Sequence, residues 1–139
     1  MGAFCVSEVS KKNKWYVPKY RYLELKYFCL QYPEWKRRTA WLLAASYGST
    51  GIQNEIHGQL EFVDRTAKLA LELTNVNSKI SLVEKTVFES DESIAPWLLK
   101  GVTEGASFVK LKSLYDIPCE RDMYYDRYRK FFWLLDKSQ

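Results

Sequence analysis

The sequence predicts an all-α fold. Hydrophobic residues make up 47% of the 139 residues and aromatic residues 16%, which is enough apolar material for a packed core. Apolar residues recur at three- and four-residue spacing in several segments, which is the period of a helix face. Six Gly, four Pro and few alternating β-branched runs argue against a β fold. We expect an N-terminal antiparallel helical hairpin followed by a C-terminal three-helix lobe.

The chain begins with a basic stretch, residues 1–18, which we expect to be a flexible lead-in. A first helix should start near Lys19. Its buried face is predicted from residues at helical spacing: Tyr20, Leu23, Tyr27 and Leu30. Pro33 suits the first turn of a second helix ending near Gly48. The apolar residues expected on this second helix are Trp35, Leu42 and Leu43, beside Thr39.

Residues 48–58 contain three Gly and read as a loop, and a long helix should follow from about Phe62 to Phe88. Six apolar residues of this helix step by four and three, which is a heptad pattern: Leu69, Leu73, Val76, Ile80, Val83 and Val87. Such a narrow seam needs one partner helix. The alternatives are the 20–43 region, which would complete a hairpin over residues 19–89, and the same helix of a second chain, which would give a homodimer.

A break at residues 90–93 marks the boundary of a second lobe, residues 90–139. A supporting helix is expected over 94–102, then a short helix, a tight turn around Asp116 and Pro118, and a long last helix ending near Leu135. Short helix, brief turn and longer helix form the layout of a helix-turn-helix, whose second helix can enter the major groove of DNA.

The last helix should bury one stripe and expose another. The buried stripe is predicted to contain Tyr124, Tyr128, Phe131 and Leu135, whereas Arg121, Tyr125, Arg129 and Phe132 fall on a neighbouring face. In the DNA-binding interpretation, Arg121 and Tyr125 reach base edges. Phosphates would be bound by Arg129, Lys130, Lys110 and Lys112. The acidic residues Glu120, Asp122 and Asp126 would oppose this contact unless they pair with arginines or face cytosine amino groups.

Charge is uneven along the chain, which carries +4 in total. Residues 1–40 and 107–139 are net positive, and residues 41–106 are net negative. This distribution suits a polyanion held by both ends, association through unlike surfaces, or simply solvated helix faces.

Catalytic constellations are scarce, and we expect neither an enzyme nor a cofactor. His57 is the single histidine, and no metalloprotease, phosphate-loop or serine-hydrolase motif is present. The three cysteines have no CxxC spacing, which favours reduced thiols over a zinc site. Cys119 is expected to act as a small N-cap of the last helix, with a reactive thiol as the alternative. No signal-like or membrane-spanning run is found, so we expect no membrane association and a cytoplasmic location.

The order of these features resembles phage and prophage transcriptional regulators of the RinA and ArpU type. The resemblance lies in an aromatic helix interrupted at Tyr32-Pro33, a long amphipathic helix over 65–88, and a final helix-turn-helix similar to region 4 of sigma factors. It implies promoter binding in a bacterial host cell and contact with host RNA polymerase or another host protein. The sequence departs from the family at Pro118, at the acidic residues named above and at the aromatic run Phe131-Phe132-Trp133.

Two functions follow from the sequence. The first is a sequence-specific regulator that binds double-stranded DNA. The alternative is a small phage interaction protein that inhibits or redirects a host protein or nucleoprotein complex, because Trp, Tyr and Arg dominate interface energetics. The aromatic residues expected to be exposed for that purpose are Trp15, Tyr16, Trp41, Tyr125 and Trp133.

Overall fold

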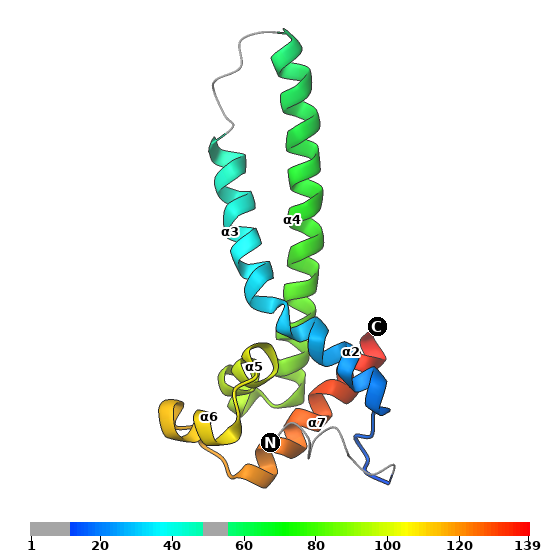
Figure 1. Cartoon of the computed structure of the whole chain (residues 1–139), viewed down its shortest axis with the longest axis vertical. Coiled ribbons are helices and arrows are strands. Elements are labelled where there is room, and N and C mark those ends of the chain that lie inside the picture. Colours follow the sequence, from blue (N-terminus) through cyan, green and yellow to red (C-terminus); the bar gives the residue numbers. More distant parts are fainter. Residues whose placement is uncertain (1–11, 49–55) are drawn as a thin grey trace. The chain divides into compact units, whose positions relative to one another are not determined.

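The computed structural model describes residues 12–48 and 56–139, and side chains are described outside residues 47–60. Every regular element in these residues is helical, which confirms the all-α class (Figure 1). The elements are α2 (Lys19–Leu30), α3 (Tyr32–Gly48), α4 (Ile56–Ser90), the single 3₁₀ turn η1 (Glu92–Ile94), α5 (Ala95–Glu104), α6 (Phe108–Tyr115) and α7 (Arg121–Ser138). Among the described residues, no helix combines the length and apolar character needed to cross a membrane.

The helix boundaries follow local signals. Asp91 caps η1 by accepting from the Ser93 backbone amide at 2.9 Å, and Gly105 ends α5 with a left-handed φ of 71°. The long helix α4 begins at Ile56, earlier than predicted, so His57 lies in its first turn. The rest of the predicted glycine-rich loop, residues 49–55, lies outside the described residues.

The chain divides into two compact units. One contains residues 1–33 and 82–139, and the other contains residues 34–81. This division differs from the boundary that the sequence placed between residues 89 and 90. The difference arises because α2 packs against α5 and α7, so the first helix belongs with the last ones.

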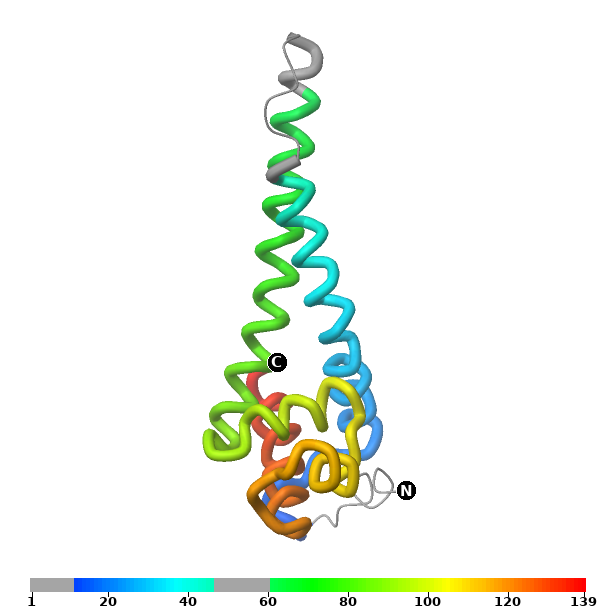
Figure 2. The backbone as a smooth tube through the Cα atoms, turned by 90° about the vertical axis from the view of Figure 1, so that its left-hand side faces the viewer, coloured from blue at the N-terminus to red at the C-terminus, as the bar shows by residue number. Residues whose placement is uncertain are grey.

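In the unit of residues 34–81, α3 lies beside α4 in both views (Figures 1 and 2). Arg38 of α3 makes two hydrogen bonds to the Glu72 carboxylate, at 2.7 and 2.9 Å. The Lys79 ammonium lies 5.8 Å from the centre of the Trp35 ring. As the chain advances from residue 35 to 38, its partner moves back from 79 to 72, so the two helices run in opposite directions.

The predicted heptad seam is buried unequally. Ile80, Val83 and Val87 are buried within the chain, whereas Leu69, Leu73 and Val76 are only half-buried. Val83 and Val87 belong to the first unit and the other four to the second. Of the six seam residues, only Leu69, Leu73 and Val76 therefore keep apolar surface available to another molecule.

The buried face of α2 is not the predicted one. Tyr22, Leu25 and Cys29 are buried, whereas Tyr20 is 76% exposed and Tyr27 61% exposed. Both faces of this helix carry apolar residues at helical spacing, and contact with α5 and α7 selects the face that includes Cys29. Burial raises the pKa of the Cys29 thiol to about 12, so this cysteine is a core residue.

Candidate functional site

Helices α6 and α7 are joined by a turn that is closed by backbone hydrogen bonds. Ser107 caps α6 by accepting from the Lys110 amide at 3.2 Å. At the other end, Asp116 takes a left-handed φ of 51°, and its amide donates to the Lys112 carbonyl. The Ile117 amide donates to the Leu111 carbonyl at 3.2 Å. Asp116 therefore adopts the conformation usually given to Gly, which aspartate tolerates better than most residues do.

The turn is also fixed from outside. Ile117 is fully buried, and the Trp97 indole donates to the Tyr115 carbonyl at 2.7 Å. The Lys112 ammonium donates to the Ile117 carbonyl at 3.2 Å. These contacts hold the start of α7 in a defined position relative to α5 and α6.

The prediction for Cys119 is wrong. The N-cap of α7 is Glu120, and Cys119 lies one residue earlier with a buried side chain. Burial raises the pKa of its thiol, so the reactive-thiol alternative fails as well. Cys119 and Ile117 are the two buried side chains of the segment between α6 and α7.

The predicted buried stripe of α7 is confirmed, because Tyr124, Tyr128, Phe131 and Leu135 are all buried. Phe132, which was expected on the outer face, is also buried, and this corrects the prediction. The cause is α2, whose Tyr22 ring packs edge-on against Phe132 at 5.0 Å. The hydroxyl groups of Tyr22 and Tyr128 are joined by a hydrogen bond of 3.2 Å.

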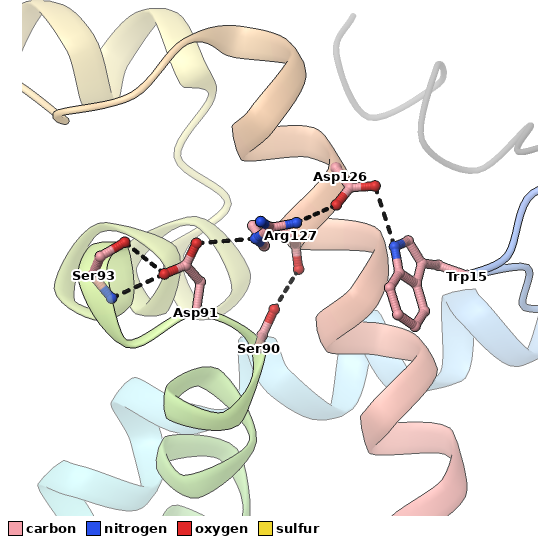
Figure 3. A network of polar contacts seen from close by, with 6 residues as sticks. All are labelled: Trp15, Ser90, Asp91, Ser93, Asp126 and Arg127. Carbon is pink, nitrogen blue, oxygen red and sulfur yellow. Dashed lines mark hydrogen bonds and ion pairs between the residues drawn. The ribbon is translucent and has the colours of Figure 1, made fainter.

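A polar network ties α7 to the end of α4 (Figure 3). The Arg127 guanidinium donates to Asp91 at 3.0 Å, and the Ser90 hydroxyl donates to the Arg127 carbonyl at 2.7 Å. Arg127 also pairs with Asp126. Partial burial acts to raise the pKa of Asp91, but hydrogen bonds from Ser93 and Arg127 outweigh it and lower that pKa.

The cationic residues predicted to contact DNA differ in exposure. Lys110, Lys112 and Arg121 are exposed, whereas Arg129 and Lys130 are half-buried. Arg129 has no carboxylate partner among the described residues, and its Nε is buried without a hydrogen-bond acceptor there.

The predicted base-reading pair, Arg121 and Tyr125, is close together. Tyr125 is half-buried, packs edge-on against Tyr124 at 5.0 Å, and lies 5.7 Å from the Arg121 guanidinium. Arg121 is therefore the more accessible member of the pair.

The acidic residues of α7 are not equivalent. Asp126 accepts from the Trp15 indole at 3.2 Å and shares the Arg127 guanidinium with Asp91, so its charge is partly offset within the fold. Glu120 and Asp122 are exposed at the first turn. Their negative charge complements the positive end of the helix dipole.

Two of the aromatic residues predicted to be exposed are packed together. Trp15 lies edge-on to Trp133 at 5.2 Å, and both are half-buried. Tyr16 and Tyr125 are half-buried as well, and only Trp41 of that set is exposed. Residues 12–18 of the predicted flexible lead-in are therefore part of the fold, since Trp15 is held by both its ring and its indole nitrogen.

Cations surround these two indole rings. The Lys14 and Lys130 ammoniums lie 5.1 and 5.6 Å from the centre of the Trp15 ring. The Lys137 ammonium lies 4.5 Å from the Trp133 ring. Sequence reasoning missed this cluster, although the spacing of Lys130, Trp133 and Lys137 by three and four residues places them on one helix face.

Comparison with known proteins gives no relative: no family model, no curated protein and no solved structure matches the chain. Within residues 12–48 and 56–139, no group of three or more His, Cys, Asp or Glu side chains could hold a metal ion.

Proposed function

We propose that the protein is a sequence-specific DNA-binding transcriptional regulator of phage or prophage type and has no catalytic role. The observation that carries this proposal is the α6–turn–α7 segment. Two helices are joined there by a left-handed residue at Asp116, and Arg121 is exposed in the first turn of the second helix. In a helix-turn-helix, the first turns of the second helix are the part that reaches base edges in the major groove.

The charges around this segment agree with the proposal. Lys110 and Lys112 are exposed on α6, in chain positions that would meet phosphates flanking the groove. Asp126, one of the acidic residues that argued against DNA contact, is held within the fold by hydrogen bonds from Trp15 and from Arg127, which it shares with Asp91. Glu120 and Asp122 stay exposed and would have to face cytosine amino groups or solvent.

The proposed mechanism is non-covalent. Phosphate neutralisation by Lys110, Lys112, Arg129 and Lys130 would supply affinity, and Arg121 with Tyr125 would supply selectivity. A second copy of the chain would pair through the half-buried seam residues Leu69, Leu73 and Val76, giving two DNA-reading helices for two half-sites. If the protein acts like the RinA and ArpU regulators that it resembles, it would also contact host RNA polymerase at a promoter.

Replacing Arg121 tests the base-reading role. We expect Arg121→Ala to weaken binding to the specific site by about 1–3 kcal/mol, because a bidentate arginine–guanine contact has about that value. The helical circular dichroism signal and the melting temperature should stay close to those of the unmodified protein, since Arg121 is exposed. Fluorescence anisotropy with a labelled duplex measures the affinity.

Arg37→Ala is a matched control, because it removes the same charge from an exposed residue of α3 that pairs with Glu34. Equal affinities of the Arg121 and Arg37 variants would contradict the assignment of α7 as the reading helix. Unfolding of the Arg121 variant would show that the face is structural.

A protein-binding role is the second candidate, and the outer surface of α6 favours it. Val109 is 74% exposed and Leu114 66% exposed, so this short helix presents apolar side chains beside its lysines. Such a surface suits a host protein better than it suits a phosphate backbone. Tight binding to one host protein, with weak and salt-insensitive binding to DNA, would favour this candidate.

A further inference from the structure

A second cationic surface lies along the outer side of α7, toward its C-terminal end. We call it the cation–indole surface and define it by Lys14, Trp15, Lys130, Trp133 and Lys137. The lead-in crosses α7 here, because Trp15 packs on Trp133 at 5.2 Å and donates to Asp126 at 3.2 Å. Residues far apart in the sequence are thereby joined into one patch of three ammonium groups on two indole rings.

Lys14, Lys130 and Lys137 form no ion pair with any carboxylate among the described residues. Other lysines do so: those at positions 68, 85 and 100 each pair with an acidic residue one helical turn away. Contact with a ring face leaves the full positive charge of an ammonium in place.

The carboxylates nearest to this surface along α7 are already occupied. Asp126 pairs with Arg127, and Asp136 accepts from the Arg21 guanidinium at 2.6 Å. The three lysines of the patch therefore keep ammonium groups without a carboxylate partner among the described residues, at positions that are exposed or half-buried.

The rings position the cations and are poorly placed to stack on bases. Each indole has an ammonium within 5.6 Å of its centre, and the two rings already pack against each other. Single-strand binders, in contrast, offer uncovered aromatic faces to the bases. Lysine ammonium groups are common ligands of phosphate oxygens, and here three of them lie against the same pair of rings.

We infer that the cation–indole surface binds phosphates of the nucleic-acid backbone. It would form a second DNA contact, in addition to the one made by the first turns of α7. This inference rests on the proposed function. A helix rises about 1.5 Å per residue, so Lys137 lies about 24 Å from Arg121 along α7. The phosphates bound here lie beyond the bases that Arg121 would read, so the contact adds affinity without adding sequence preference.

The salt dependence of DNA binding tests the inference. Binding of a labelled random-sequence duplex is followed by anisotropy between 50 and 200 mM salt for the full chain, for Lys14→Gln/Lys137→Gln, and for Lys68→Gln/Lys85→Gln. Both double variants remove two exposed lysine charges, but the second removes them from α4, where each pairs with a carboxylate. The melting temperature of each variant is measured alongside.

The logarithm of the binding constant falls as the logarithm of the salt concentration rises. We expect this negative slope to be shallower by about 1.8 in the Lys14/Lys137 variant, because each phosphate contact contributes about 0.9. The unmodified chain would then lose about twelvefold more affinity than this variant over the same fourfold rise in salt. The Lys68/Lys85 variant should keep the slope of the unmodified chain.

Equal slopes for the two variants, with salt-dependent binding by the unmodified chain, would overturn the inference and leave the proposed function standing. Absence of duplex binding by the unmodified chain at 50 mM salt would contradict both this inference and the proposed function. Loss of binding to phosphatidylserine vesicles in the Lys14/Lys137 variant, with an unchanged DNA slope, would assign the surface to a lipid headgroup and would also overturn the inference.

Discussion

At the scale of single residues, Gly101 and Tyr124 pack closely against each other. Gly101 is buried in α5, and a Cβ atom there would overlap the Tyr124 hydroxyl. That hydroxyl is itself buried and has no hydrogen-bond partner among the described residues. Burial also raises the pKa of Tyr124. The pair therefore combines a steric limit on α5 with an unpaired polar group on α7.

This pair gives a prediction about stability. Gly101→Ala should destabilise the fold by about 1–3 kcal/mol, because an added methyl group overpacks the core. Tyr124→Phe should be neutral or stabilising by up to about 1 kcal/mol, because it removes a buried polar group that has no partner. The double variant should regain part of the stability lost by Gly101→Ala. Urea denaturation midpoints measure all three.

The coupling between the two sites is the critical quantity. Residues in contact show non-additive effects, whereas independent sites add within about 0.5 kcal/mol. A double variant whose change in stability equals the sum of the two single changes would mean that Tyr124 does not limit the space at Gly101. Ala70→Gly, a change at an exposed residue of α4 in the unit of residues 34–81, serves as a background with no expected coupling to Tyr124→Phe.

At the scale of elements, the network around Asp91 fixes α7 to the end of α4. Asp91 caps η1 through Ser93 and accepts from Arg127 of α7 at 3.0 Å (Figure 3). One carboxylate thus sets both the break after α4 and the placement of the last helix. Because the pKa of Asp91 is lowered in the fold, the stabilisation that its carboxylate gives depends on pH.

We expect acid to remove the stabilisation that the Asp91 carboxylate gives. The carboxylate of an unfolded chain has a pKa of about 3.9, and the folded value lies lower, so the stabilisation is complete above about pH 4 and is lost as pH falls through the folded pKa. Asp91→Asn should lower the unfolding free energy at pH 7 by about 1–2 kcal/mol, a value reduced for partial exposure. It should also flatten the dependence of stability on pH below about pH 4.

Asp64→Asn is the matched control, because Asp64 forms an exposed pair with Lys68. Thermal unfolding followed by circular dichroism from pH 2 to pH 7 measures both variants. An Asp91 variant with the same pH profile as the unmodified protein would show that Arg127 and Ser93 do not hold the charged form.

Periodicity predicted most elements but not their partners. The 108–115 helix, the turn at Asp116 and the buried stripe of α7 follow from local spacing, which depends only on neighbouring residues. The buried face of α2 does not, because Tyr20 and Tyr22 begin two apolar stripes of equal period and only tertiary contact chooses between them. Phe132 was misplaced for the same reason, since α2 covers it.

In the candidate site too, local spacing predicts some features and tertiary contacts decide the others. Exposure of Lys110, Lys112 and Arg121 agrees with the helical wheel. The contact of Trp15 with Asp126 and Trp133 joins residues more than a hundred positions apart, and no local pattern predicts such a pairing. The pairing of Asp126 with its neighbour Arg127 was one of the alternatives left open by the sequence, which does not choose between pairing and repulsion.

At the scale of the whole molecule, both units are net positive, and the excess in the first unit lies in residues 1–33 (+4) and not in residues 82–139 (−1). Residues 1–33 and 82–139 form the unit that contains α7, and they carry +3 of the total charge of +4. The unit of residues 34–81 carries +1 and consists of two helices with a half-buried seam. In the proposed function, the first unit would contact DNA and the second would pair with a second copy of the chain.

The most direct test of DNA recognition is anisotropy binding of the unmodified protein to random duplex DNA and to duplex fragments from its own genomic neighbourhood. Each is measured at low and near-physiological salt. We expect binding to random DNA to fall steeply with salt while binding to one fragment survives, because phosphate contacts are screened and base contacts are not. No binding to any duplex at low salt would contradict the DNA-binding role and leave the exposed apolar surface of α6 as the candidate for a protein partner.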